Sequence, residues 1–307
     1  MPRADTWRGI FPAICTPFTP DDAVDYEAQR RVVRFVLDGG AHGIVAFGLA
    51  GEVLRLTADE RRELTNVIID ETAGAAPVFV GAGAPSVSAS IVLAQHAERA
   101  GADCIVLPAP VSPGLSQDAL VDYFVRVAAA VSTPVMIQDA PAYLGVGLGP
   151  DLVARVAERA GNVRHVKLEA GPAEMSGWLD RLGADLAIWG GDGGVYLLDC
   201  IRTGATGIIP GADLVDRLVA VYEAEAAADS AQANSLFADL LPMLVFEMQH
   251  SVEHYNACAK LVLRRRGVLE HTLLRAPATP LPEASRGLLE RHLLALGFPA
   301  EEPITSA

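Results

Sequence analysis

The sequence predicts a single (β/α)8 barrel followed by a C-terminal helical segment. Eight short apolar runs alternate with helix-patterned segments between residues 9 and 209, which is the alternation that produces a closed parallel sheet. After about residue 213 the strand pattern stops and only helical periodicity continues. We therefore assign residues 1–225 to the barrel and residues 226–307 to the helical segment.

The eight runs are almost entirely apolar, as expected for parallel strands that are covered on both faces. An open, doubly wound sheet is the alternative, and its phosphate-binding loop needs three glycines. The stretch 81–86, Gly-Ala-Gly-Ala-Pro-Ser, supplies only two, which favours the barrel. The predicted strands are Gly9–Ala13, Gly43–Phe47, Val78–Gly81, Asp103–Leu107, Pro134–Gln138, Val163–Lys167, Leu186–Trp189 and Ala205–Ile209.

Helix start signals stand between the predicted strands. Thr57 and Glu60 form a capping-box pattern before one amphipathic segment. Ser116 can cap the helix that begins at about residue 117, and Pro150 suits the first turn of another.

Composition excludes several classes of function. The chain has 307 residues, of which 51% are hydrophobic, and a net charge of -14. This charge argues against binding to nucleic acid or to an anionic membrane surface. No run approaches about 18 apolar residues, and the start, MPRADTWRG, lacks the apolar stretch of a signal peptide. The four cysteines are scattered without a CxxC pair, which indicates free thiols and a reducing cytoplasm.

Lysine is almost absent from the chain. Of its 24 basic residues 22 are Arg, and the two lysines are Lys167 and Lys260. Arg cannot lose its proton to become a nucleophile, whereas a desolvated lysine can. A sequence that otherwise uses Arg keeps a lysine where an amine is needed, so these two positions are the candidates for amine chemistry.

Lys167 ends the sixth predicted strand, and catalytic groups of barrels gather at the C-terminal ends of strands. Its amine can attack a ketone to form an iminium, which then accepts electrons from a neighbouring bond. Strand alternation places Glu169 on the same side, either as an acid–base group or as the counter-ion of Lys167. His165 lies one layer deeper, and we interpret it as a core residue.

Two glycine-containing loops are candidates for substrate binding. Gly48, Leu49, Ala50, Gly51 and Glu52 follow the second strand, and backbone N–H groups there can hold a carboxylate.

Asp192 lies in a glycine-rich stretch after the seventh strand, where it can either bind substrate hydroxyls or cap the next helix. His250 and His254 are spaced i, i+4 near Glu247 and Glu253, but the HExxH order is absent. We interpret this segment as an exposed polar face outside the barrel mouth, and we expect neither a metal nor a cofactor.

Together these pieces resemble the dihydrodipicolinate synthase/N-acetylneuraminate lyase family of class I aldolases over almost the whole chain. The resemblance rests on Ala13–Phe18 with Asp25, on Gly48–Glu52 with Leu56–Arg61, on Val166-Lys167, on Gly191-Asp192, and on Lys260 with Arg275-Ala-Pro277. It implies a barrel, a Schiff base on Lys167 and a homo-oligomer, either a dimer or a tetramer.

The departures from the family pattern concern proton transfer and substrate binding. Both hydroxyls of the family's GTTGE motif are replaced, by Leu49 and Ala50. The family's catalytic tyrosine falls on Gln138, which cannot relay a proton. The tyrosine lent to a neighbouring subunit falls near Pro110, and the arginine that binds a second carboxylate in the synthases falls near Tyr143. The lost proton relay and the lost binding site for a second carboxylate both argue against a true dihydrodipicolinate synthase.

The prediction is therefore a Schiff-base lyase or aldolase that acts on pyruvate or a related 2-oxo acid. Lys167 is its nucleophile and Gln138 can hydrogen-bond a substrate oxygen, while Asp139, Glu169 and Tyr143 are the candidates for moving protons. One alternative is a dehydratase of a 3-deoxy-2-oxo sugar acid, which uses the same iminium and expels water. Another is a non-catalytic binding or regulatory descendant of the family.

Overall fold

A computed structural model describes residues 7–112, 114–249 and 251–300. Eight parallel strands follow the order β1-β8-β7-β6-β5-β4-β3-β2. Around Ala13 the chain bridges to Val45 on one side and to Gly211 on the other, so the sheet closes on itself. The strands are β1 Gly9–Ile10, β2 Ile44–Ala46, β3 Val78–Gly81, β4 Cys104–Pro108, β5 Val135–Asp139, β6 Val163–Leu168, β7 Ala187–Gly190 and β8 Gly207–Ile208.

The predicted (β/α)8 barrel is confirmed. A doubly wound sheet would reverse its strand order at one point, whereas here each strand pairs with its neighbours in sequence and the last pairs with the first. All eight predicted strands are present; β3 has the predicted ends, and the ends of the others differ from the predicted ones by at most three residues.

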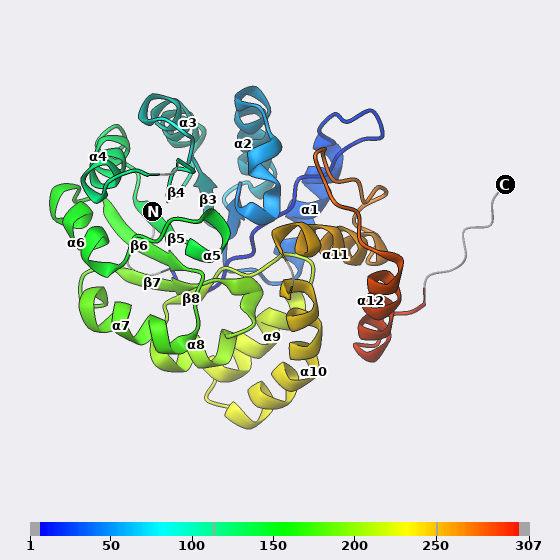
Figure 1. The fold of residues 1–307 in the computed structure, drawn as a ribbon. Helices are drawn as coiled ribbons and strands as arrows, with labels where there is room; N and C mark the ends of the chain where they lie inside the picture. The colour runs from blue at the N-terminus through cyan, green and yellow to red at the C-terminus, as the bar shows by residue number, and fades with distance from the viewer. Residues whose placement is uncertain (1–6, 113, 250, 301–307) are drawn as a thin grey trace.

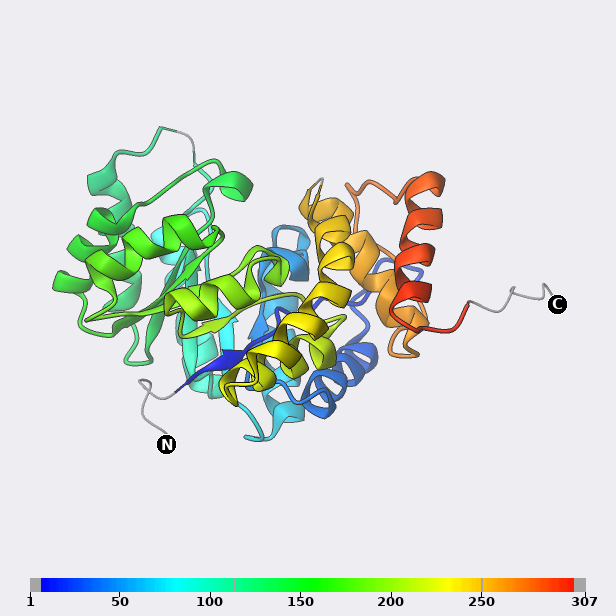
Figure 2. The same cartoon turned by 90° about the horizontal axis from the view of Figure 1, so that it is seen from below.

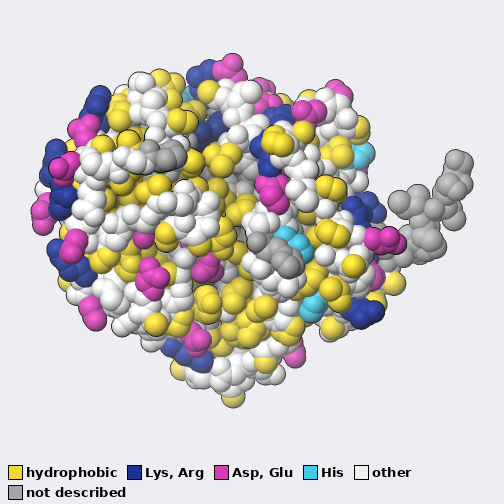
Figure 3. All heavy atoms as spheres, viewed as in Figure 1, with side chains coloured by type: hydrophobic (Ala, Val, Ile, Leu, Met, Phe, Trp, Pro, Cys, Tyr) yellow, Lys and Arg dark blue, Asp and Glu magenta, His cyan; other side chains and the backbone are white. Residues whose placement is uncertain are grey.

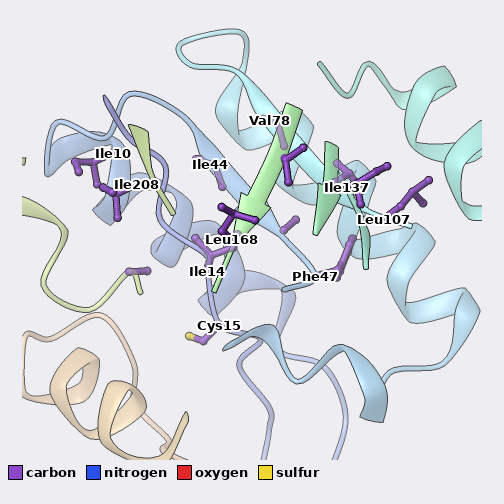
Figure 4. Close-up of a cluster of buried hydrophobic side chains, with 14 of the residues drawn as sticks. Ile10, Ile14, Cys15, Ile44, Phe47, Val78, Leu107, Ile137, Leu168 and Ile208 are labelled. Atoms are coloured by element: carbon purple, nitrogen blue, oxygen red, sulfur yellow. The ribbon is translucent and has the colours of Figure 1, made fainter. Parts of the chain in front are cut away.

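The barrel is filled by alternate residues of its strands. Residues that point inward form one apolar cluster, and residues that point outward pack against the helices. Leu107 and Ile137 are register partners of each other and belong to the outer cluster, part of which Figure 4 shows. Trp7 closes the inner cluster, with its ring 5.0 Å from that of Phe79. The inner cluster comprises Trp7, Phe11, Ala13, Val45, Phe79, Cys104, Val106, Met136, Trp189 and Ile209.

Helices surround the strands (Figure 1). The capping box of Thr57 and Glu60, the cap of Ser116 and the first-turn position of Pro150 are all present as predicted. The helices are α1 Tyr26–Asp38, α2 Ala58–Thr72, α3 Val87–Ala100, α4 Gln117–Ala128, α5 Pro141–Leu144, α6 Pro150–Arg159, α7 Pro172–Leu182, α8 Leu197–Thr203, α9 Val215–Ala226, α10 Ser230–Met248, α11 Val252–Arg265 and α12 Glu283–Ala295. The 3-10 turns within the described residues are η2 Leu49–Gly51, η3 Val53–Arg55 and η4 Asp192–Gly194.

The C-terminal helices α10, α11 and α12 stand to one side of the barrel (Figure 2). Helix α11 packs against η2, and α10 packs against η4, so both reach loops at the C-terminal ends of strands. No helix of residues 7–112, 114–249 and 251–300 has the length and apolarity that crossing a bilayer requires. On the face drawn in Figure 3, Lys and Arg side chains lie mostly around the periphery.

A buried ion pair joins the C-terminal helices to the barrel. Lys260 of α11 donates to Oε1 of Glu52 at 2.5 Å and to the Leu273 carbonyl at 2.6 Å. Both partners are at most 1% exposed, and the Lys260 ammonium lies 4.4 Å from the centre of the Phe18 ring. The backbone N–H of Arg275 donates to the other oxygen of Glu52 at 3.0 Å. Glu52 therefore fixes the loop after β2 against the C-terminal segment.

Replacing Lys260 with Met is expected to destabilise the protein by about 3–5 kcal/mol, because it leaves Glu52 buried without its main counter-charge. Urea denaturation measures the change in the free energy of unfolding. The control is Arg126→Met, which breaks the exposed pair with Asp122 and is expected to cost less than about 1 kcal/mol. Equal losses in the two variants would contradict a structural role for the Lys260–Glu52 pair.

Candidate active site

An open pocket with about 470 Å3 of empty space lies at the C-terminal ends of the strands. Barrels carry their active sites at this end because the loops after the strands converge there. The pocket is mainly apolar, with a few polar groups that include one lysine and one carboxylate. Its lining residues are Ala13, Leu49, Ala50, Gln138, Tyr143, Lys167, Glu169, Gly193, Ile209, Pro210, Gly211, Met248, Val252 and Tyr255.

Lys167 reaches the pocket from β6. Its register partners are Gln138 on β5 and Trp189 on β7, and the residue is only 7% exposed. Its Nζ lies 2.6 Å from Oε1 of Glu169, and the side chains of both residues are 8% exposed. The two sequence interpretations of Glu169 are therefore compatible, because a counter-ion at this distance is also placed to accept a proton from the ammonium.

Glu169 is held by three neighbouring strand ends. The backbone N–H of Glu169 donates to the Asp139 carbonyl at 3.0 Å, which extends the β5–β6 ladder and keeps the side chain on the inner face. Oε1 also accepts a hydrogen bond from the Gln138 amide at 2.9 Å, and Oε2 accepts one from the Asp192 N–H at 2.5 Å. A Cβ on Gly191 would lie 2.1 Å from Oε2, so only glycine fits beside this carboxylate.

Tyr143 and Asp192 form a second layer around the carboxylate. The Tyr143 hydroxyl donates to Oδ1 of Asp192 at 2.9 Å. Burial and the nearby Asp192 carboxylate raise the pKa of Tyr143, so its hydroxyl keeps its proton at neutral pH. Burial and the Glu169 carboxylate raise the pKa of Asp192. Tyr143 lines the pocket, whereas Asp192 lies behind it.

The structure does not bring Asp139 to the pocket. Asp139 precedes the loop to α6, and its carboxylate accepts the Leu148 N–H at 3.0 Å. Strand alternation explains this placement, because Gln138 points inward and its neighbour must point outward. Burial raises the pKa of Asp139. Its side chain therefore orders the loop between α5, which carries Tyr143, and α6. The expectation that Asp139 moves substrate protons is not supported by its position.

The loop after β2 has two parts: its first residues line the pocket, and its last residue contacts the C-terminal segment. Leu49 and Ala50 line the pocket at the start of η2, where the first N–H groups of a helical turn have no partner within that turn. Thr16 fixes the end of the turn through a hydrogen bond from its hydroxyl to the Gly51 carbonyl at 2.8 Å. Glu52 turns away from the pocket toward Lys260, which corrects its predicted role in substrate binding. Gly48 precedes the turn in extended conformation.

Sequence reasoning missed the contribution of the C-terminal helices. Met248, Val252 and Tyr255 line the pocket, so the segment predicted to lie outside the barrel mouth forms part of its wall. The expectation of an exposed polar face is wrong for His254 and Glu247, which are buried. Met248 ends α10 and the other two residues lie on α11, and the i, i+3 spacing of Val252 and Tyr255 is common to any amphipathic helix.

The remaining histidine predictions divide into three outcomes. His165 is 1% exposed inside the barrel and accepts a hydrogen bond from the Trp189 indole at 3.3 Å, as expected of a core residue. His254 makes a hydrogen bond with the Phe246 carbonyl at 3.1 Å. His250 lies outside the described residues. Within the part of the chain that the structure describes, no three His, Cys, Asp or Glu side chains are grouped to bind a metal ion.

The closed barrel and its buried pocket lysine define the class of protein as a lyase of the class I aldolase type. The model of the dihydrodipicolinate synthetase family matches residues 6–296, and the chain belongs to this family.

Two curated relatives carry different names. The 4-hydroxy-tetrahydrodipicolinate synthase of Chloroherpeton thalassium is 33% identical over 289 residues, which cover 93% of this chain and 94% of the relative. The L-2-keto-3-deoxyarabonate dehydratase of Azospirillum brasilense is 30% identical over 282 residues, which cover 90% and 89%. Among solved structures, YagE, a prophage protein of E. coli K12 in complex with pyruvate, has a TM-score of 0.89 and 28% identity, covering 95% of this chain and 99% of YagE.

The raised pKa of Asp139 predicts a pH-dependent stability difference. The folded protein holds a proton on Asp139 at pH values where the unfolded chain has released it, so this residue lowers stability as the pH rises from about 4 through the raised pKa. Asp139→Asn keeps an acceptor for Leu148 but removes this loss. The stability of the variant relative to wild type should therefore increase with pH over that window.

Urea denaturation at several pH values between about 4 and 7 checks this prediction. Asp38→Asn, at an exposed aspartate of α1, supplies the baseline. A difference between Asp139→Asn and wild type that does not vary with pH would contradict the assignment.

Proposed function

We propose that this protein is a Schiff-base-forming lyase that acts on pyruvate or a related 2-oxo acid. The observation that carries the proposal is the amine of Lys167, which lies in a largely apolar pocket 2.6 Å from the Glu169 carboxylate. The pyruvate complex of the similar protein YagE adds support, because it associates the same fold with a 2-oxo acid.

Glu169 prepares Lys167 for attack. The carboxylate takes a proton from the ammonium across the 2.6 Å contact, and the free amine attacks C2 of the 2-oxo acid. The carbinolamine then loses its hydroxyl as water, with Glu169 returning the proton, and the iminium remains on Nζ. Gln138 and the Asp192 N–H hold the carboxylate in place during both transfers. The chemistry needs an amine and a proton carrier, and no metal or cofactor.

The turn η2 is placed to hold the substrate carboxylate. The N–H groups of Leu49 and Ala50 stand at the first positions of the turn, and both residues line the pocket that contains Lys167. Because neither side chain has a hydroxyl, backbone donors carry this recognition. Leu49 and Ala50 also make this wall apolar, which suits a substrate with few polar groups beside the carboxylate.

We infer that the protein is not a dihydrodipicolinate synthase, although relatives carry the name of such a synthase. Gln138 binds Glu169 and cannot relay protons as the family's tyrosine does. Tyr143, near the position of the family's carboxylate-binding arginine, is neutral and hydrogen-bonded to Asp192. A substrate with a second carboxylate would find no cation at this position.

A dehydratase of a 3-deoxy-2-oxo sugar acid is the second candidate. The relative named as an L-2-keto-3-deoxyarabonate dehydratase favours it, because it is similar over nine-tenths of this chain. The same iminium serves both reactions: it accepts the electrons of a C–C bond in a lyase that releases pyruvate, and of a C–H bond before loss of a hydroxyl in a dehydratase. We place either enzyme in the cytoplasm as a homo-oligomer, a dimer or a tetramer.

Incubation with pyruvate and borohydride is expected to add one reduced pyruvate to the chain, because borohydride reduces the iminium to a stable amine. Peptide mass mapping should locate the adduct on Lys167. With only two lysines in the chain, the assignment is unambiguous, and Lys167→Ala should abolish the adduct while Lys260→Met retains it in folded protein. An adduct that survives in Lys167→Ala would contradict the proposal.

A panel of 3-deoxy-2-oxo sugar acids separates the two candidates. Release of pyruvate, measured with a coupled lactate dehydrogenase assay, is expected if the enzyme cleaves a C–C bond. Loss of water without pyruvate release, measured by mass, would instead identify a dehydratase. In either case Glu169→Gln should lower turnover by about 10²-fold or more, because an amide cannot take the proton of Lys167.

A further inference from the structure

Tyr255 reaches the pocket from helix α11. It lines the same pocket as Lys167 and Glu169, and the residue is 7% exposed. Its hydroxyl donates to Oδ1 of Asp213 at 2.8 Å. A Cβ on Gly211 would lie 1.7 Å from this hydroxyl, so the phenol enters the end of β8 only because position 211 has no side chain.

Behind Tyr255 two carboxyl groups face each other in the protein interior. Asp213 and Glu247 are each 2% exposed, and the charge of Asp213 acts on the Glu247 carboxyl group. Among the described residues, Oδ2 of Asp213 and Oε1 of Glu247 have no hydrogen-bond partner. Arg266 donates to the Asp213 backbone carbonyl and to the Asp216 carboxylate.

The two carboxyl groups hold one proton between them. Two buried carboxylates in contact cannot both ionise, because each raises the pKa of the other. Burial and the Asp213 charge raise the pKa of Glu247 well above its ordinary value, and burial also raises the pKa of Asp213. The nearby thiols of Cys15 and Cys258 remain neutral, since burial raises the pKa of Cys15 to about 12 and also raises the pKa of Cys258.

The buried Asp213–Glu247 pair does not contribute to the stability of the fold as apolar side chains would. A buried carboxyl pair without a cation stabilises less than apolar side chains of similar volume would. The carboxyl pair is connected through Asp213 to the Tyr255 hydroxyl in the pocket wall. The same pocket contains Gln138, whose amide cannot carry a proton. Glu169 is already bound to Lys167, Gln138 and the Asp192 N–H. Tyr255 is therefore a second proton carrier, placed to act on a substrate atom other than the one that Glu169 serves.

We propose that Tyr255 is the catalytic acid–base residue that moves the proton at C3 of the Lys167-bound 2-oxo acid, and that Asp213 and Glu247 hold the proton it exchanges. The inference rests on the proposed Schiff-base function. When the C3–H bond breaks, its electron pair forms the C2–C3 double bond and the iminium π electrons move to Nζ, which gives an enamine. The C3 proton passes to the Tyr255 oxygen as the phenolic proton passes to Asp213.

The carboxyl pair thereby changes from one proton and one negative charge to two protons and no charge. The reverse transfers return the proton to C3 and restore the pair. Asp213 and Glu247 act through Tyr255 and are positioning residues, because neither lines the pocket.

Exchange of the pyruvate methyl hydrogens in D2O, followed by NMR, tests the proposal. Tyr255→Phe and Asp213→Asn are each expected to slow the exchange by about 10²-fold, because the proton path is cut at one of two successive groups. Both variants should still form the borohydride-trapped adduct on Lys167, which shows that the barrel and its lysine are intact. Tyr222→Phe, at a tyrosine of α9 outside the pocket, is the control and should exchange at the wild-type rate.

The double variant tests whether Tyr255 and Asp213 act as one unit. It should exchange about as slowly as either single variant, because groups that act in sequence lose their effect together. Multiplicative losses would overturn the proposed relay, as would an unchanged exchange rate in Tyr255→Phe that still forms the adduct. Wild-type protein that forms the adduct without exchange would also overturn it. Absence of the wild-type adduct would overturn the proposed function together with this inference.

Discussion

The Glu169 carboxylate organises the C-terminal ends of three neighbouring strands. It binds Lys167 on its own strand, Gln138 on β5 and the N–H of Asp192 after β7. Each contact provides a hydrogen-bond or ion-pair partner to a carboxylate whose side chain is only 8% exposed. The same contacts also fix the position of the amine. Gln138 suits this arrangement, because an amide donates a hydrogen bond to a carboxylate without competing for its proton.

The barrel and its lysine could be predicted because both depend on local features of the sequence. Eight apolar runs report burial on both faces, and the scarcity of lysine directs attention to Lys167. Strand alternation also predicted that Glu169 shares the inner face with Lys167, which the 2.6 Å contact agrees with. The predicted ends of short strands were less accurate. In β8, for example, only two residues meet the ladder geometry, while the apolar run extends further.

The predictions for Asp139, Glu52 and the C-terminal helices did not agree with the structure, and each depends on contacts between distant segments. Asp139 lies beside Gln138 in sequence, but the inward direction belongs to only one of two neighbouring strand residues. Glu52 follows the pocket loop, yet its partner Lys260 lies 208 residues away. His254 and Glu247 were assigned to a polar surface, although both are buried, because the helical pattern does not reveal which element covers which face.

Two pairs of ionisable groups lie at the pocket or behind its wall, and their environments differ in one physical respect. The Lys167–Glu169 contact balances a cation with an anion, so moving one proton between them changes no net charge. Among the described residues no Lys or Arg forms an ion pair with the Asp213 or Glu247 carboxylate, and Arg266 binds the Asp213 backbone carbonyl instead. Accepting one proton therefore removes a buried charge, and releasing it restores that charge. The first arrangement favours transfer within the pair, and the second favours taking a proton from a neighbour. A reaction that needs both a nucleophilic amine and removal of a carbon-bound proton requires these two properties in one pocket.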